Sequence, residues 1–335
     1  MSAIKQCIGI DISQNSFTAC LCVATRADQT FSKVRTFKNE KTGFNQLLRW
    51  ASKTIDQHIE LVYLMEATGV YYEHLAYHLS NLKKTVHVVL PNTSKHYFSS
   101  LNIKTKTDKI DARILSRFGV ERRHKAWQAP TPVLLELRNL TRYYVQLQEQ
   151  KTALNNIKHS KEAAHAVQHF ILKSNRTLVK QIDKQIERCK SQVAVLIAKD
   201  SELNNKIQNI LTIKGVGLIT AATVVAETLG FQHVKNVKQI VSYAGYDVVQ
   251  RESGTSIKGK TRISKKGNRY IRNALYFPAM VSCRYNPFLK TAYLRIIQKK
   301  PSKMIGQVAV QRKLLVLIYS LWKTDMPYMV DYKKQ

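Results

Sequence analysis

The stretch QCIGIDI at residues 6–12 decides the fold of the N-terminal part of this chain. Its nearly unbroken run of apolar residues predicts a strand that is buried on both faces, near the centre of a sheet. The same run places Asp11 among apolar neighbours. A buried lone carboxylate is unfavourable unless a cation or a hydrogen-bond donor compensates it, so we expect such a partner beside Asp11.

Outward from this strand, short β-type runs alternate with helical periods. The sequence predicts strands at 6–12, 17–24, 33–37, 60–66 and 86–90, and helices near 42–53, near 71–82 and from about 108. Three successive strands followed by alternating helices and strands are typical of an α/β domain with a mixed sheet flanked by helices. We expect this domain over residues 1–128.

The stretch QAPTP at 128–132 ends this pattern. After it, apolar residues recur at three- and four-residue steps over 134–157 and again over 178–197, which predicts two long amphipathic helices. They would form an antiparallel or an intermolecular coiled coil in a helical linker over 129–200, and a homo-oligomer, dimer or tetramer, is expected through them. His165 and His169 between them are interpreted as solvated.

The composition points to a polyanionic partner. The chain has 54 Lys+Arg against 22 Asp+Glu and a formal net charge of +32, which favours nucleic acid over a membrane surface. No apolar run approaches the roughly 20 residues of a membrane span, and the stretch MSAIKQCIGID lacks the pattern of a signal peptide. We therefore expect a cytoplasmic, nucleoid-associated protein without a membrane partner, and its five cysteines without a CxxC pair to be reduced thiols.

The region 201–335 is predicted to be a basic, mainly α domain. LTIKGVGLITAATVVAETL at 211–229 resembles a helix-hairpin-helix unit, in which Gly215 and Gly217 let backbone N–H groups approach a phosphate beside Lys214. Residues 251–313 carry 16 Lys or Arg against one acid, Glu252, which favours a phosphate-binding surface. Its predicted nucleic-acid contacts are Arg251, Lys258, Lys260, Arg262, Lys265, Lys266, Arg269 and Arg272.

Three further acids follow the pattern of Asp11. Glu66 closes the apolar strand ELVYLME, and Asp108 and Asp111 share one turn at a helix start. Singly, each acid has an ordinary alternative as a helix cap, an ion-pair partner or a solvated strand end. Together, four carboxylates from three elements predict a site for one or two Mg²⁺ ions, with Mn²⁺ as a substitute, of the type that cleaves phosphodiesters.

Several stretches resemble a known family. IGIDIS, MEATGVYYEHLA, VVLPNTSKHY and TDKIDARILS are similar to the RuvC-like, DEDD-type domain of the Piv/MooV invertases and the "one-ten" insertion-sequence transposases. ILTIKGVGLITAATVVAE, SYAGYDVVQRESGTS and RISKKGNRYIRNALYFPA resemble the C-terminal transposase domain of the same family. The resemblance implies an RNase H-like fold, with Asp11, Glu66, Asp108 and Asp111 as the acids that bind Mg²⁺.

The resemblance also implies a serine nucleophile that recombines element ends with target DNA, guided by a structured RNA. Ser253 in RESGTS fits the family's Ser-Gly pattern best, because Gly254 would leave the hydroxyl open while Arg251 and Lys258 screen the phosphate charge. Ser256 and Ser264 are the alternatives. The chain departs from the family at Tyr246, Asp247 and Val248, where relatives continue into a proline-containing turn, and this departure bears on where Ser253 lies.

Two rival functions are compatible with the same residues. A metal-dependent endonuclease of the Holliday-junction type would use the four acids without a covalent serine intermediate. A non-catalytic protein that packages RNA or DNA would need only the basic surface. The function that the sequence favours is that of a DNA recombinase of the transposase type, which transfers phosphodiester bonds. The sequence has no GxxxxGK[ST] nucleotide-binding loop, which agrees with strand exchange that needs no ATP.

Overall fold

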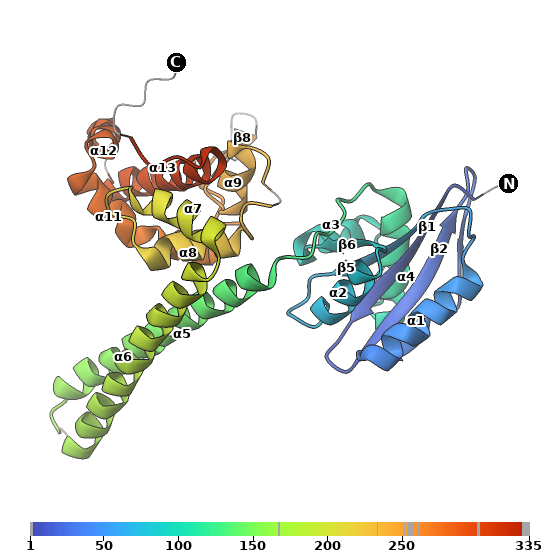
Figure 1. Cartoon of the computed structure of the whole chain (residues 1–335), viewed down its shortest axis with the longest axis horizontal. Helices are drawn as coiled ribbons and strands as arrows, with labels where there is room; N and C mark the ends of the chain where they lie inside the picture. The colour runs from blue at the N-terminus through green and yellow to red at the C-terminus, as the bar shows by residue number, and fades with distance from the viewer. Residues whose placement is uncertain are drawn as a thin grey trace. The chain divides into compact units, whose positions relative to one another are not determined.

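In this computed structural model the chain forms two compact units, Met1–Ala129 and Pro130–Gln335 (Figure 1). The structure describes residues 3–166, 168–232, 234–250, 252–253, 257–259, 261–299 and 302–329. The division falls inside the QAPTP stretch, next to the predicted end of the first domain at residue 128. All five cysteines are free thiols.

The first unit is built on a six-stranded mixed sheet. Its strands are β1 (Lys5–Ile12), β2 (Ser16–Ala24), β3 (Gln29–Phe31), β4 (Arg35–Lys38), β5 (Leu61–Glu66) and β6 (Thr85–Val89). The order is β3-β2-β1-β5-β6, with β4 also paired to β2; β2 is antiparallel to β1, whereas β5 and β6 are parallel to it. This arrangement confirms the mixed, RNase H-like sheet and places the QCIGIDI strand at its centre.

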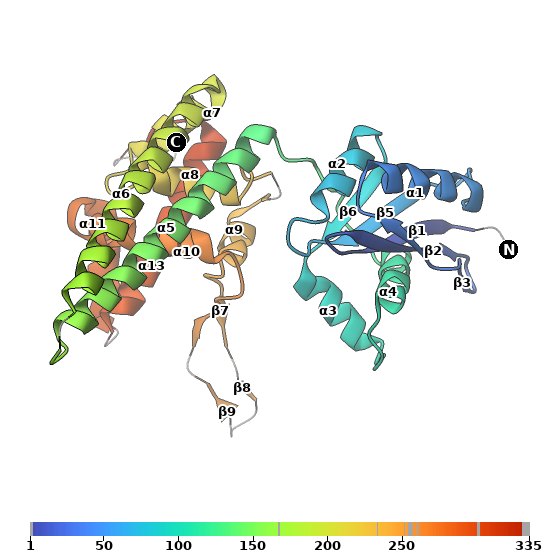
Figure 2. The ribbon, with the colours of Figure 1, turned by 90° about the horizontal axis from the view of Figure 1, so that it is seen from below.

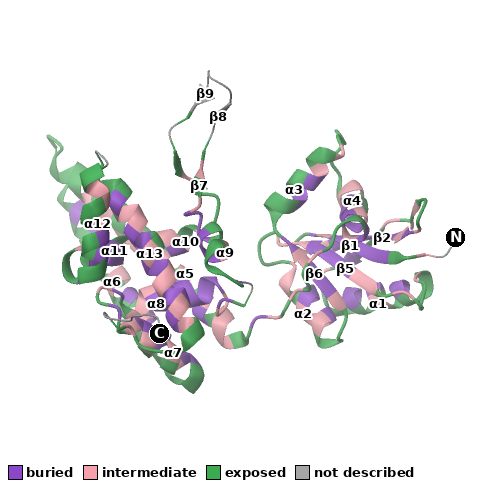
Figure 3. Cartoon of the chain, turned by 90° about the horizontal axis from the view of Figure 1, so that it is seen from above, coloured by how far each residue is buried: buried purple, intermediate pink, exposed green. Residues whose placement is uncertain are grey.

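Helices cover both faces of the sheet. The helices of this unit are α1 (Lys41–Thr54), α2 (Glu73–Asn81), α3 (Pro91–Ser100) and α4 (Asp108–Glu121). Because successive side chains of a strand point to opposite faces, Ile8 and Ile10 of β1 pack with α1 and α2, while Cys7 packs with Leu115 and Phe118 of α4. The two long strands β1 and β2 are accordingly buried along most of their length (Figure 3). The sequence analysis missed β3 and α3.

Two glycines bring α4 into direct contact with β1. A Cβ atom on Gly9 would overlap the backbone at Ala112 and Ser116, and one on Gly119 would overlap Cys7. Since Cys7 faces the end of α4 and Gly9 faces its middle, the helix runs back along the strand. Asp11, two residues beyond Gly9 on the same face, therefore meets the first turn of α4.

The second unit is mainly helical, as predicted. Its helices are α5 (Pro132–Glu162), α6 (His169–Ala198), α7 (Ser201–Leu211), α8 (Leu218–Glu227), α9 (Val237–Tyr243), α10 (Arg269–Ala274), α11 (Tyr276–Tyr285), α12 (Pro287–Lys299) and α13 (Lys303–Thr324). Helices α5 and α6 pack against each other around Leu147 and Ile186, and the Asn175 side chain donates to the Leu154 carbonyl at 3.0 Å. The antiparallel alternative is thus realised within one chain, and the oligomeric state stays a prediction. Leu137 of α5 joins the main core of this unit, so the linker predicted over 129–200 packs on the domain that follows it.

Helix α13 is the one helix in the described part of the chain that is long and apolar enough to cross a membrane. Its most apolar window has a mean hydropathy of 1.3, and 44% of that window is buried inside the unit. Leu314, Leu315 and Ile318 have no exposed surface and belong to the main core. These contacts are those of a core helix.

A β-ribbon projects from the helical body of the second unit (Figure 2). Strand β7 (Val248–Val249) pairs with β10 (Arg262–Ile263), and farther out β8 (Glu252–Ser253) pairs with β9 (Ile257–Lys258). We call residues 248–263 the arm. The sequence analysis did not predict it, because two-residue strands among Gly, Ser, Thr and Lys have the composition of a loop.

Candidate functional site

The carboxyl-terminal ends of β1 and β5 bring two of the predicted acids together. In the parallel register Ile10 lies opposite Met65, so Asp11 and Glu66 are the next residues along the two neighbouring strands. Both point to the face that carries α4, and the first turn of α4 supplies Asp108 and Asp111. Asp11, Glu66 and Asp111 are half-buried and Asp108 is exposed. The structure therefore gathers all four acids at one end of the sheet.

The acids interact electrostatically. Burial raises the pKa of Asp11 from 3.8 to about 6, the negative charges of Asp111, Asp108 and Glu66 add to the rise, and Lys106 opposes it. The pKa of Asp111 is also raised, chiefly by burial, with Lys106 acting against the rise. Carboxylates whose ionised forms are disfavoured by one another make an environment that favours a bound cation.

Hydrogen bonds orient Glu66 and the start of α4. The Thr68 hydroxyl donates to Glu66 Oε1 at 2.8 Å, and the hydroxyl of the fully buried Ser94, on α3, donates to Oε2 at 2.5 Å. Thr107 caps α4 by accepting a hydrogen bond from the Ile110 N–H at 3.3 Å. Ser94 and Thr68 were not identified from the sequence, since a short hydroxyl side chain gives no pattern that points to a distant carboxylate.

The donor set suits a hard divalent cation in its chemistry, because all four side chains offer carboxylate oxygens. Within the described residues, however, no three Asp, Glu, His or Cys side chains stand close enough to form a closed metal site. The two oxygens of Glu66 are engaged by hydroxyl groups. Holding an ion would thus require the carboxylates to draw closer together, and a bound cation would offset the repulsion among them.

The predicted glycine-containing turn lies between α7 and α8. Gly215 has φ +100°, a backbone conformation that L residues rarely adopt, and the hydroxyl of Ser282 donates to the Lys214 carbonyl at 3.0 Å. Gly217 is the residue before α8, and a Cβ atom there would meet nothing within 4 Å. The turn at Gly217 is therefore open, whereas a Cβ atom on Gly215 would lie 2.8 Å from the Ser282 hydroxyl, so Gly215 packs against α11. The helix-hairpin-helix unit and its phosphate contact stay predictions.

The predicted cationic contacts are spread over the arm and the segment after it. Ser253 and Lys258 belong to the outer strand pair and Arg262 to the inner pair, whereas Arg251, Gly254, Ser256 and Lys260 lie outside the described residues. Lys265, Lys266 and Arg269 are exposed. Arg272 is half-buried and donates to the Ala244 carbonyl at 2.8 Å, which is a structural contact.

The arm is anchored at its base. Ser264 donates its hydroxyl to Asp247 Oδ1 at 2.6 Å, and its N–H to the Asp247 carbonyl at 2.8 Å. A Cβ atom on Gly267 would lie 2.5 Å from the Tyr243 carbonyl oxygen, so the two segments at the base pass each other closely. Tyr246 is one of the residues at which the chain departs from the family pattern. Its side chain is buried, and its hydroxyl donates a hydrogen bond to Gln311 Oε1 at 2.9 Å.

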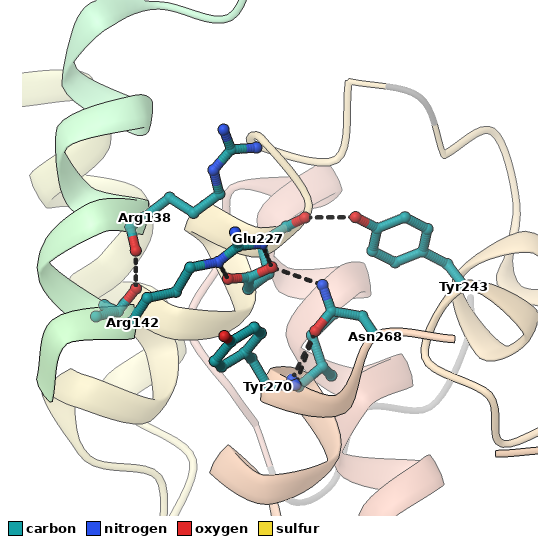
Figure 4. Close-up of polar contacts among 8 residues, drawn as sticks. Arg138, Arg142, Glu227, Tyr243, Asn268 and Tyr270 are labelled. Atoms are coloured by element: carbon teal, nitrogen blue, oxygen red, sulfur yellow. Dashed lines mark hydrogen bonds and ion pairs between the residues drawn. The ribbon is translucent and has the colours of Figure 1, made fainter. Parts of the chain in front are cut away.

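A buried ion pair that the sequence analysis missed holds this base to the helical body (Figure 4). The Glu227 side chain is 1% exposed, and its two oxygens accept hydrogen bonds from Arg142 Nε at 2.6 Å and Nη2 at 2.9 Å. Asn268 donates to the same carboxylate at 2.6 Å, and the Tyr243 hydroxyl donates to the Glu227 carbonyl at 2.7 Å. Arg142 also lies over the Tyr270 ring, 4.8 Å from its centroid.

The ion pair links three elements to the segment that leaves the arm. Arg142 comes from α5 and Glu227 from the end of α8, while Asn268 caps α10 by accepting hydrogen bonds from the N–H groups of Tyr270 and Ile271. The partners Arg142 and Glu227 are 85 residues apart, and no local spacing connects them. The only sequence signal is an acid that ends the apolar run VVAE in a region poor in acids.

Replacing Arg142 by Ala is expected to lower the free energy of unfolding of the second unit by about 3 kcal/mol, because it leaves the buried Glu227 carboxylate without its cation. Lys151→Ala is the matched control on the same helix: its ion pair with Asp183 is partly solvent-exposed, and its loss should cost no more than about 1 kcal/mol. Urea unfolding followed by circular dichroism measures both. Equal losses for the two variants would show that the Glu227 contact is not a stabilising anchor.

The sequence comparisons agree with the geometry. Residues 8–161 match a family described as a DEDD transposase of the IS110 group, and residues 207–294 match the "Transposase IS116/IS110/IS902 family". The chain is 30% identical to the pilin gene-inverting protein of Moraxella bovis over 326 residues, which is 97% of this chain and 98% of the relative. It is also 30% identical to the pilin gene-inverting protein of Moraxella lacunata, over 329 residues.

Among solved structures, RuvC of Thermus thermophilus aligns with 36% of this chain and 99% of its own length, at 10% identity and a TM-score of 0.28. A second solved structure, of T. thermophilus RuvC with a Holliday junction substrate, aligns at 11% identity and a TM-score of 0.27.

Proposed function

The chain belongs to the IS116/IS110/IS902 transposase family and is a DNA recombinase of the transposase type; we propose that it breaks and rejoins DNA with a divalent metal ion at its acidic site and a serine nucleophile on its arm. The observation that carries the proposal is the gathering of Asp11, Glu66, Asp108 and Asp111 at the carboxyl ends of β1 and β5. Four carboxylates gathered at one sheet end, two of them with a raised pKa, suit phosphodiester chemistry better than a structural role.

In the proposed site the four acids hold one or two Mg²⁺ ions, with Mn²⁺ as a substitute. The ion supplies Lewis-acid stabilisation of the charge that develops on the phosphate. Ser94 and Thr68 orient Glu66. Lys106, whose charge acts on both Asp11 and Asp111, is placed to attract the DNA phosphate toward the acids.

Ser253 is the proposed nucleophile. Its Oγ attacks a DNA phosphorus, a phosphoserine ester forms, and the P–O bond to the neighbouring nucleotide breaks, with the serine proton passing to the departing oxygen. The ester keeps the energy of the broken bond for rejoining. The structure supports Ser253 over Ser264, because the Ser264 hydroxyl is engaged by Asp247 at the base of the arm while Ser253 belongs to the outer strand pair. Ser256 lies outside the described residues.

The proposed partners are the DNA of the element ends and target, together with a structured guide RNA, in a cytoplasmic homo-oligomer. The absence of acids from residues 253–324, which contain 16 Lys or Arg, supports a nucleic-acid surface in the second unit. The exposed Lys214 beside the turn at Gly215, and the exposed Lys265, Lys266 and Arg269, provide sites for phosphate contact.

Metal binding at the acids is tested by stability without any DNA. The folded pKa of Asp11, about 6, lies above its ordinary value of 3.8, so its ionisation opposes folding. This cost is absent below about pH 4, grows as pH rises to about 6 and is complete above it. In chelator at pH 7, Asp11→Asn should therefore be about 1–2 kcal/mol more stable than wild type, after allowance for partial exposure, and the difference should vanish near pH 4.

Adding Mg²⁺ should raise the melting temperature of the wild-type protein and leave that of Asp11→Asn nearly unchanged, because a ligand that binds only the folded state stabilises it. Differential scanning calorimetry in chelator and in Mg²⁺ measures both effects. If Mg²⁺ shifts the two proteins equally, the acids do not hold the ion and the metal-dependent mechanism fails.

A further inference from the structure

Helix α11 is apolar on its outer side as well as on its inner side. Ala279 and Ser282 are buried in the unit, yet Phe277 and Tyr285 are 70% and 65% exposed. The exposed residues fall at helical spacing and continue onto α12, where Phe288 is also exposed. We call this surface the aromatic face; it consists of Tyr276, Phe277, Met280, Val281, Tyr285 and Phe288. An exposed apolar surface of this extent marks the binding site of a partner.

The surroundings of the aromatic face are cationic. Arg284 lies between Met280 and Tyr285 on the outer side of the helix, and Lys313 Nζ lies 5.4 Å from the centre of the Phe288 ring. Residues 253–324, which include all of α11, α12 and α13, contain no Asp or Glu. If a second copy of the chain bound here through the same surface, positive charges would face one another without acids to compensate them. A polyanion would instead be attracted, so the charges favour a nucleic acid as the partner of this face.

Exposed rings interleaved with cations are the recognition chemistry of single-stranded nucleic acids, in which unpaired bases stack on rings and the backbone contacts Lys or Arg. A duplex cannot use the rings, because its bases are stacked on one another. We propose that the aromatic face binds unpaired nucleotides of a single strand, with Phe277 and Tyr285 stacking on bases and Arg284 contacting the phosphates. This deepens the proposed function and rests on it in taking nucleic acid as the partner.

A hollow beside Phe277 fits the same ligand. It has a volume of about 690 Å³ and is bounded by α5, α8, α10 and the start of α11. Tyr144, Gln148 and Asn273 line it, and the Gln148 amide donates to the Tyr144 hydroxyl at 3.1 Å. The amide oxygen of Gln148 and the amide of Asn273 offer the acceptor and donor groups that the hydrogen-bonding edge of a base needs. Among the described residues that line the hollow, Glu149 is the one acid. Its negative charge disfavours a phosphate, while its carboxylate can accept hydrogen bonds from the amino group of a base. The hollow therefore suits a neutral base next to a ring.

The test uses the full-length protein and two substitutions, Phe277→Leu and Tyr285→Leu, which keep apolar surface and remove the ring. Fluorescence anisotropy with labelled single-stranded RNA and, separately, single-stranded DNA should show about tenfold weaker binding for each variant. Phe170→Leu is the matched control, since Phe170 is 82% exposed at the start of α6 and should leave affinity unchanged. Comparing the affinities for RNA and DNA shows which kind of single strand the face binds, because only RNA offers a 2′-hydroxyl.

A second strand with abasic residues in place of bases separates stacking from charge. It should bind the wild-type protein about as weakly as the normal strand binds Tyr285→Leu, with little further loss when the two changes are combined. Normal affinity in both Leu variants overturns the proposal, as does a loss of oligomers in sedimentation with unchanged strand binding, which would assign the face to self-association.

The proposed reaction is scored separately by DNA cleavage. Asp11→Asn should bind the single strand normally, so a failure of the metal mechanism leaves the binding result intact. Conversely, the Leu variants could bind the strand normally while DNA cleavage still depends on the acids. That result would contradict the aromatic-face proposal and leave the proposed reaction intact.

Discussion

Asp11→Asn and Asp111→Asn are expected to lose DNA strand cleavage by at least about 100-fold, since even the outer partners of metal ligands typically contribute 10–100-fold. The amide keeps the size of the carboxylate and removes its charge. Asp11 and Asp111 are the two acids of the site whose pKa is raised by burial, and the loss of a negative charge there weakens the binding of a cation. Gel analysis of end-labelled DNA in Mg²⁺ measures the cleavage.

DNA binding by the same variants should be unchanged or slightly tighter, because a negative charge near the phosphate path is removed. Asp56→Asn is the matched control: Asp56 is an exposed acid of the same unit whose carboxylate accepts a hydrogen bond from the His58 N–H. It should cleave at the wild-type rate. Normal cleavage by both site variants would leave the acids without a catalytic role, whereas DNA binding without any cleavage by the wild-type protein would favour the packaging protein.

Ser253→Ala is expected to abolish the covalent protein–DNA adduct completely, because alanine has no oxygen to form the phosphoserine ester. Recombination should be lost with it. Denaturing gel electrophoresis of the protein with labelled DNA detects the adduct, and a joined-product assay by amplification across the new junction measures recombination.

Ser264→Ala is the control within the same region. It removes the hydrogen bond to Asp247 and should cost about 1 kcal/mol of stability at the base of the arm while the adduct persists. Ser256→Ala tests the remaining alternative. If Ser253→Ala, Ser256→Ala and Ser264→Ala all cleave DNA as wild type does, the reaction needs no covalent serine, and the metal-dependent endonuclease is the better description.

The N-terminal fold was predictable because its signals are local. The apolar run at 6–12 identifies a central strand by composition alone, and the strand and helix periods that follow agree with the observed elements within a few residues. The pairing of Asp11 with Glu66 follows from two parallel strands that end in acids. Strand β3, helix α3 and the arm were missed, since each is short or polar and is stabilised by neighbours rather than by its own pattern.

What the sequence determined by itself is the chemistry of the parts: four carboxylates at element ends, a serine beside a glycine, and an acid-free cationic region. Tertiary structure decided which of these parts meet. Gly9 and Gly119 allow α4 to lie on β1 and so bring Asp111 to Asp11, and the Glu227 carboxylate finds Arg142 from a helix 85 residues earlier. The reason is physical: periodicity reports only on neighbours three or four residues away, whereas close packing and the need to pair a buried charge act between residues that share no sequence spacing.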